Sequence, residues 1–157
     1  MTRLPLRGLA LPLAAVLLLS IVAACDEAGG SSGPGGGRAP TSLAGAAWVV
    51  ASVSGQAAIP GGEPTVAFTA TAVSGSAGCN QYSGRYQYDP PTGRLAFGDI
   101  AMTAMACVDD RRNAFETLFS NALRQVDHAE VDAAGRLVLG GPGGVIVLTN
   151  GRIPVEG

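Results

Sequence analysis

Short runs of β-branched and aromatic residues, separated by glycine and proline, dominate the chain from residue 43 onward. Such runs are typical of strands, because these side chains pack well on a pleated surface and Gly or Pro clusters end the run. The last two runs are apolar on both faces, as in the interior of a sheet or barrel. The expected strands cover residues 48–53, 65–69, 85–89, 94–97, 129–132, 136–139 and 145–149.

One segment has helical periodicity instead. From Phe115 to Val126 the large apolar residues fall within an arc of about 140° when each residue turns the chain by 100°. Asp109 or Asp110 can cap the start of this helix, and Arg124 lies near its end. A catalytic carboxylate pair is the alternative interpretation of the two aspartates, but capping explains them without further assumptions.

The first 24 residues differ in composition from the rest. They contain 17 hydrophobic residues, and their only charges are Arg3 and Arg7. This layout predicts a secretory signal at residues 1–24. A retained membrane anchor is the alternative, but the apolar run is shorter than the roughly 20 residues that cross a bilayer, and it contains a proline. The run ends in Val22-Ala23-Ala24-Cys25, which resembles the bacterial lipobox, so we expect acylation of Cys25 and stable attachment to a membrane.

Residues 25–42 are predicted to form a tether. The part from residue 28 to 40 holds six glycines and no large apolar side chain, so it cannot bury enough surface to offset its ordering entropy. The folded domain is expected at residues 43–157, and its length can support one core. We therefore expect an exported protein of the cell envelope, lipid-anchored on the periplasmic or extracellular side of a membrane.

The charged residues exclude several functions. All ten basic residues are arginines. Without the signal, eight of them remain against twelve acidic residues, so the chain cannot supply the clustered basic surface that nucleic acids require.

The sequence also shows no catalytic or metal-binding pattern. His128 is the single histidine, and no metal-ligand spacing is visible. Nucleophilic catalysis by Cys79 would need a base and an orienting group. We therefore expect no enzymatic activity, no cofactor and no metal, with a thiol-dependent enzyme as the less favoured alternative.

Two cysteines remain once Cys25 carries lipid. Cys79 and Cys107 would then lie in an exported compartment that permits disulfides. A disulfide between them would stabilise the fold by about 3.6 kcal/mol, because the closed loop lowers the chain entropy of the unfolded state. The sequence leaves open whether they are bonded, because it does not give their distance in space.

The residues around these cysteines resemble a known family. Residues 74–84 (SGSAGCNQYSG) and 103–107 (TAMAC) resemble the two signature segments of the META domain family. Trp48 in the first strand, the glycine-rich hairpin at residues 135–149 and the helix also fit its pattern. Val108 departs from it, since many relatives have proline there. The matching helix positions are Glu116, Phe119, Ala122 and Leu123.

The resemblance implies a mainly β fold, namely a compact antiparallel barrel-like or strongly curved sheet of about seven to eight strands with one packed α-helix. It also implies a structural motif made of Gly78, Asn80, Gly84, Thr103 and Met105. Glycine at positions 75, 78 and 84 lets the backbone turn or pass close to another strand, and Asn80 is suited to bonding backbone groups in a turn.

The function implied by the resemblance is non-enzymatic. We expect a monomeric envelope lipoprotein that serves envelope integrity or stress tolerance by binding an envelope protein or a small apolar ligand. A barrel mouth lined by Tyr82, Tyr86 and Tyr88 would suit such a ligand, although packing and strand stabilisation also explain these tyrosines. A purely structural envelope component is a further alternative.

Overall fold

The computed structural model describes residues 36–151. The predicted secretory signal, Cys25 and most of the predicted tether lie outside this range. Within it, no helix is both long and apolar enough to cross a bilayer.

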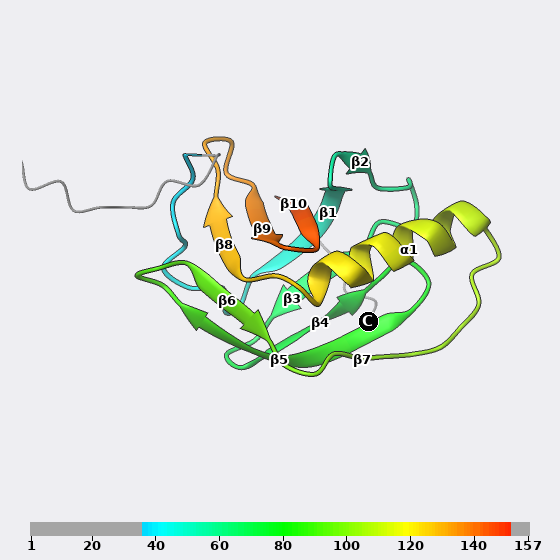
Figure 1. Cartoon of the computed structure of the whole chain (residues 1–157), viewed down its shortest axis with the longest axis horizontal. Helices are drawn as coiled ribbons and strands as arrows, with labels where there is room; N and C mark the ends of the chain where they lie inside the picture. Colours follow the sequence, from blue (N-terminus) through cyan, green and yellow to red (C-terminus); the bar gives the residue numbers. More distant parts are fainter. Residues whose placement is uncertain (1–35, 152–157) are drawn as a thin grey trace, which may run out of the picture. The chain divides into compact units, whose positions relative to one another are not determined.

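Eight antiparallel strands form a closed barrel (Figure 1). Neighbouring strands pair in the order β10-β9-β8-β6-β5-β4-β3-β1, and β10 also pairs with β1. Two short strands lie outside this circuit: β2 (Gln56–Ala57) pairs with β1, and β7 (Ala101–Met102) pairs with β5. The expected mainly β fold with a barrel-like sheet is confirmed. The barrel strands are β1 (Ala47–Val53), β3 (Thr65–Phe68), β4 (Ala72–Ser76), β5 (Gln81–Asp89), β6 (Arg94–Phe97), β8 (His128–Val131), β9 (Leu137–Gly141) and β10 (Gly144–Asn150).

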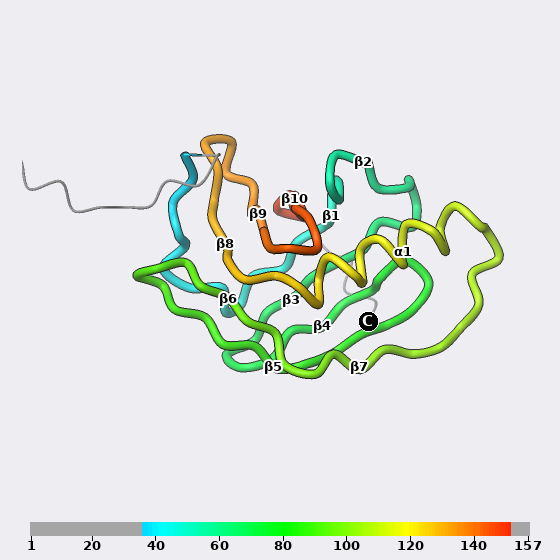
Figure 2. The backbone as a smooth tube through the Cα atoms, in the orientation of Figure 1, coloured from blue at the N-terminus to red at the C-terminus, as the bar shows by residue number. Residues whose placement is uncertain are grey.

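The first and last strands close the barrel, as the backbone trace shows (Figure 2). Their register runs from Trp48 opposite Asn150 to Val53 opposite Ile146, with an irregularity between Val50 and Ser52. A bulge of this kind bends a strand and increases its twist, which helps a sheet to close. Closure also leaves no barrel strand at the end of an open sheet, although β8 pairs with β6 at a single position.

Helix α1 (Asp110–Leu123) is the one α-helix among residues 36–151, as expected from the sequence. Its N-cap is Asp109, whose carboxylate accepts a hydrogen bond of 2.8 Å from the Arg111 backbone N–H. The helix contacts β10 and β1 (Figure 1). Its buried side chains Phe115, Phe119 and Leu123 join the barrel core, so helix and barrel share one hydrophobic interior.

The end of the predicted tether packs on the barrel. Arg38 and Val131 of β8 exchange two backbone hydrogen bonds, of 2.8 and 2.9 Å. The Tyr88 hydroxyl donates to the Pro40 carbonyl at 2.6 Å. Strand β6 pairs with β8 only where Arg94 faces His128. The rest of that edge of β8 is therefore free to pair with Arg38. Ordered structure therefore begins before residue 43, although the composition of this segment predicts a free linker.

Strand β4 was not expected from the sequence. Its residues AVSGS include three small side chains and one glycine, which have weak strand propensity. The fold requires this glycine: a β-carbon at Gly75 would overlap the Thr65 carbonyl group of β3 and would lie 3.0 Å from the Tyr82 hydroxyl. Close backbone approach, rather than side-chain propensity, therefore specifies β4.

Replacing Gly75 by alanine should destabilise the barrel by about 2 kcal/mol, within the usual range for overpacking. The new methyl group would meet a backbone carbonyl that cannot rotate away. Gly98→Ala is the matched control, because its β-carbon would lie 3.6 Å from the Arg85 carbonyl oxygen, an ordinary contact. Urea unfolding monitored by circular dichroism measures both variants, and equal midpoints would contradict the close-approach explanation.

Candidate functional site

The two segments that carry the predicted motif meet beside helix α1. Cys79 and Asn80 follow β4, whereas Met105 and Cys107 follow β7. A disulfide joins Cys79 to Cys107, with their Cα atoms 5.7 Å apart. We call the group formed by Gly78, Cys79, Asn80, Thr103, Met105, Cys107 and Glu116 the signature cluster.

Asn80 is the centre of the signature cluster. Its side-chain oxygen accepts hydrogen bonds from the Met105 backbone N–H at 2.7 Å and from the Thr103 hydroxyl at 2.9 Å. Its amide nitrogen donates to the Met105 carbonyl at 3.1 Å and to Glu116 Oε1 at 2.6 Å. The side chain is 5% exposed, and its two donors and two acceptor sites are all used. Asn80 therefore fastens one signature segment to the other across 25 residues of sequence, rather than only shaping its own turn.

Glu116 is the member of the cluster whose role the sequence did not indicate. Its Oε2 accepts the backbone N–H groups of Cys79 at 2.9 Å and Asn80 at 2.7 Å. Burial by itself raises the pKa of this carboxyl group, yet the hydrogen bonds from Asn80 and Cys79 outweigh burial and hold the pKa below its ordinary value. Glu116 is thus an ionised, buried group at neutral pH. The available signal was its position: Glu116 shares the apolar helix face with Phe119 and Leu123.

The motif glycines occupy restricted positions. Gly78 has φ of +126°, a conformation that side chains rarely adopt, and it leads the chain into the two N–H groups that bind Glu116. Gly84 lies in β5 opposite Val73, and a β-carbon there would overlap the Ile100 side chain. Both observations agree with the interpretation of these glycines as sites of turning and close approach.

The three tyrosines each donate to a backbone carbonyl. Tyr82 bonds Thr65 at 2.8 Å and Tyr86 bonds Thr69 at 2.7 Å, while Tyr88 bonds Pro40 as described above. Tyr82 is 3% exposed, and burial strongly raises the pKa of its hydroxyl group. These contacts favour packing and strand stabilisation over a ligand site as the role of the tyrosines.

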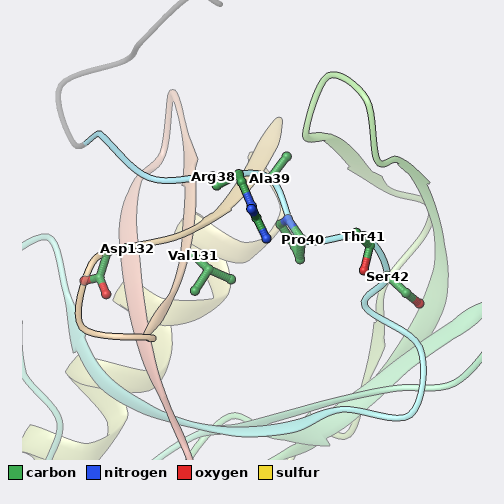
Figure 3. A pocket seen from close by; sticks show the side chains of 7 residues that line it. All are labelled: Arg38, Ala39, Pro40, Thr41, Ser42, Val131 and Asp132. Atoms are coloured by element: carbon green, nitrogen blue, oxygen red, sulfur yellow. The ribbon is translucent and has the colours of Figure 1, made fainter.

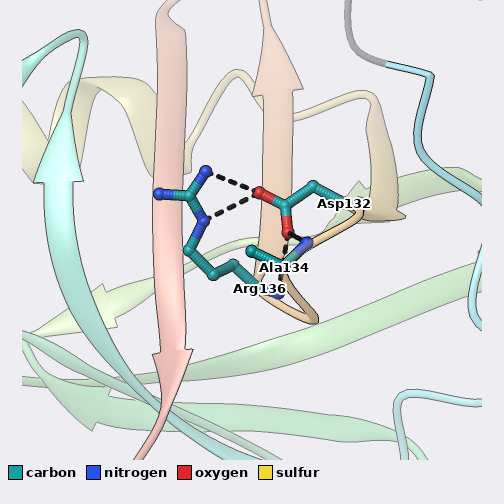
Figure 4. A network of polar contacts seen from close by, with 3 residues as sticks. All are labelled: Asp132, Ala134 and Arg136. Carbon is teal, nitrogen blue, oxygen red and sulfur yellow. Dashed lines mark hydrogen bonds and ion pairs between the residues drawn. The ribbon is translucent and has the colours of Figure 1, made fainter.

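A shallow surface pocket of about 390 Å³ lies where the chain enters the barrel (Figure 3). Residues 38–42 form one side, and Val131 and Asp132 form the other. The Asp132 carboxylate accepts the backbone N–H groups of Ala134 and Arg136, each at 2.9 Å, and pairs with the Arg136 guanidinium at 2.7 Å (Figure 4). Backbone and side-chain hydrogen bonds from Arg136 lower the pKa of Asp132. This carboxylate therefore holds the turn between β8 and β9 and has little capacity left for a ligand.

His128 does not join the signature cluster. It lies on β8, with Nδ1 2.6 Å from the Asp127 carboxylate and its ring against Gly140. A different group of candidate ligands does converge: the Cys79 and Cys107 sulfurs and a Glu116 oxygen lie within 4.8 Å of one another. The sequence showed no third ligand near the cysteines, because Glu116 reaches them only through the packing of α1.

Replacing Glu116 by glutamine should destabilise the protein by about 2 kcal/mol at neutral pH, as expected when buried hydrogen bonds to a charged group are lost. Asn80 cannot turn over to compensate, since its oxygen already accepts the Met105 N–H. The glutamine amide would therefore face either the Asn80 amide or the two backbone N–H groups. Urea unfolding measures the loss in unfolding free energy, with Glu63→Gln as the control because Glu63 is exposed. Similar decreases in unfolding free energy for the two variants would contradict the role assigned to Glu116.

Stability should also depend on pH through Glu116. Because its pKa is lower in the folded than in the unfolded state, its ionised form stabilises the fold above the unfolded pKa, and this contribution is lost as pH falls through the folded pKa. The difference in unfolding free energy between wild type and Glu116→Gln should therefore shrink on acidification below about pH 5. A difference that stays constant between pH 7 and pH 3 would show that the carboxylate charge contributes nothing.

Comparison with known proteins agrees with this architecture. The META domain profile matches residues 41–152. A protein from Burkholderia xenovorans, solved by NMR, is similar in structure with a TM-score of 0.54 and 27% identity, over 68% of this chain and 81% of that one. A second NMR structure gives a TM-score of 0.55 and 27% identity, over 69% of this chain and 91% of its own. No protein with a curated description matches the sequence. The chain belongs to the META domain family.

Proposed function

We propose that this protein is an envelope lipoprotein, anchored through acylated Cys25, whose META domain acts by binding another envelope protein and not by catalysis. The observation that carries the anchoring is the Val22-Ala23-Ala24-Cys25 sequence after an apolar leader, followed by a glycine-rich segment. On this proposal the domain is held close to a membrane, where a binding role would serve envelope integrity or stress tolerance.

The composition of the barrel interior supports binding at the outer surface. The interior is filled by apolar side chains, among them Leu95, Leu139, Ile146 and Leu148, each at most 1% exposed. Such packing is typical of a solid core and disfavours the alternative of a small apolar ligand inside the barrel. The polar atoms of Asn80 are bonded internally, which favours a scaffolding role for the signature cluster over a catalytic one.

Two of the three exposed large apolar side chains among the described residues lie in one short loop segment. Residues 101–108 contain no charged side chain, and most of them are exposed. Met105 is 60% exposed and Val108 is fully exposed, although both are large apolar residues. Exposed large apolar side chains that gather in one short segment are more typical of a protein contact than of a free surface. We place the partner contact at this loop.

The anchoring proposal predicts the mass of the mature protein. Protein extracted from membranes should lack residues 1–24 and carry the added mass of acyl chains on Cys25. Cys25→Ser should leave the membrane fraction, because the thiol is the group that carries the thioether-linked lipid. Intact-mass spectrometry and membrane fractionation test both points. An unmodified N-terminus on the extracted protein would refute the anchoring.

The binding proposal predicts site-specific crosslinks in intact cells. A photo-crosslinking residue at position 108 should capture a discrete envelope protein, whereas the same residue at exposed Thr92, in the turn between β5 and β6, should not. Mass spectrometry of the crosslinked species identifies the partner. Equal crosslinking at the two positions, or none at position 108, would contradict a partner contact at the apolar loop.

A further inference from the structure

Three potential metal ligands converge from three segments of the chain. Cys79 follows β4, Cys107 precedes α1, and Glu116 lies in the second turn of α1. Their sulfur and oxygen atoms lie within 4.8 Å of one another, and this group is the one cluster of at least three such ligands among residues 36–151. Two thiolates and a carboxylate are donors that Zn²⁺ accepts in proteins.

Glu116 keeps the capacity to bind a cation while holding its hydrogen bonds. A carboxylate offers about four acceptor sites, and Glu116 accepts three hydrogen bonds, two at Oε2 and one at Oε1. One acceptor site at Oε1 therefore stays unused. The bond from Asn80 to Oε1 fixes the orientation of the carboxylate, as hydrogen bonds to metal ligands commonly do.

The cysteines can separate without disturbing the barrel. Two thiolates on one tetrahedral Zn²⁺ lie about 3.8 Å apart, given Zn–S bonds of about 2.3 Å. Cys107 belongs to neither a strand nor a helix, and within the described chain no backbone–backbone hydrogen bond holds residues 106–108. Cys79, in contrast, is fixed by the hydrogen bond from its own N–H to Glu116. Movement of the Cys107 side of the cluster can therefore make room for the ion.

We propose that the reduced, dithiol form of this protein binds one thiophilic divalent cation, such as Zn²⁺, through the sulfurs of Cys79 and Cys107 and Oε1 of Glu116, and that the disulfide form does not. A dithiol reductant supplies the two electrons: it is oxidised to its own disulfide, and Cys79 and Cys107 each gain a proton. Metal binding then releases these two protons as the thiols become thiolates. The charge of the ion offsets two of the three negative charges that it brings together.

Cadmium titration of the full-length chain tests the proposal, with Cys25→Ser as the background of every sample, the reference called wild type included, because the Cys25 thiol would itself bind Cd²⁺. The protein is reduced with a phosphine, which takes its oxygen from water, and is then freed of reductant under anaerobic conditions. Cd²⁺ should produce thiolate-to-metal charge-transfer absorption that saturates at one ion per chain. The oxidised protein and the Cys79→Ser/Cys107→Ser variant should produce none. Absence of the absorption in reduced wild type, or equal binding in the oxidised protein, would overturn the proposal.

The carboxylate is tested separately. Glu116→Gln should bind Cd²⁺ at least about tenfold more weakly, whereas Glu63→Gln should bind as wild type does. An unchanged affinity in Glu116→Gln would remove Glu116 from the ligand set and overturn the three-ligand site. Should Glu116→Gln fail to fold, X-ray absorption of reduced, zinc-loaded wild type decides. We expect two sulfur ligands at about 2.3 Å and oxygen ligands at about 2.0–2.2 Å. A shell of four sulfurs would show an ion shared between chains and would refute the proposal.

Discussion

The hydrogen bonds between Asn80 and Glu116 link the parts of this domain that the barrel alone does not hold. The barrel is closed by strand pairing, but the segment after β7 and the start of α1 lack ladder partners. Glu116 binds the backbone after β4, and Asn80 binds the backbone after β7. A buried charge is costly unless its hydrogen bonds are complete, so the two segments and the helix have to be placed together or not at all.

The closure of the barrel explains why this linkage lies outside it. Along the main strands the backbone groups are consumed by pairing, and the interior is filled by apolar side chains. Polar side chains are left to organise the connections. Asp132 does so in the turn between β8 and β9, and Asp109 does so at the start of α1. Asn80 and Glu116 also hold connections between elements, but between segments further apart in the sequence. Because both side chains are buried, each of their hydrogen bonds affects stability more than an exposed one would.

Most strands and the helix could be predicted from the sequence because their evidence is local. Val49 and Val50, or Ile146 and Leu148, show strand character without reference to any partner. Strand β4 could not be predicted in this way, since Gly75 is specified by a carbonyl group of β3. Arg38 pairs with β8 only because β6 leaves that edge open, which no property of the segment itself reveals. In each case the missing information was a neighbour distant in sequence.

The same distinction applies to the candidate site. The motif residues Cys79, Asn80 and Cys107 could be identified by their pattern, but the pattern gave no reason to connect them to a carboxylate. Glu116 shares the apolar face of the helix, but its contact with Cys79 and Asn80 arises only when Phe115 and Phe119 pack that face against the barrel. Its hydrogen bonds fix Cys79 and Asn80, whereas residues 106–108 make no backbone–backbone hydrogen bond and are held by the disulfide of Cys107. Once the disulfide is reduced, the position of Cys107 can therefore change while the Asn80–Glu116 linkage, and the fold that depends on it, stays in place.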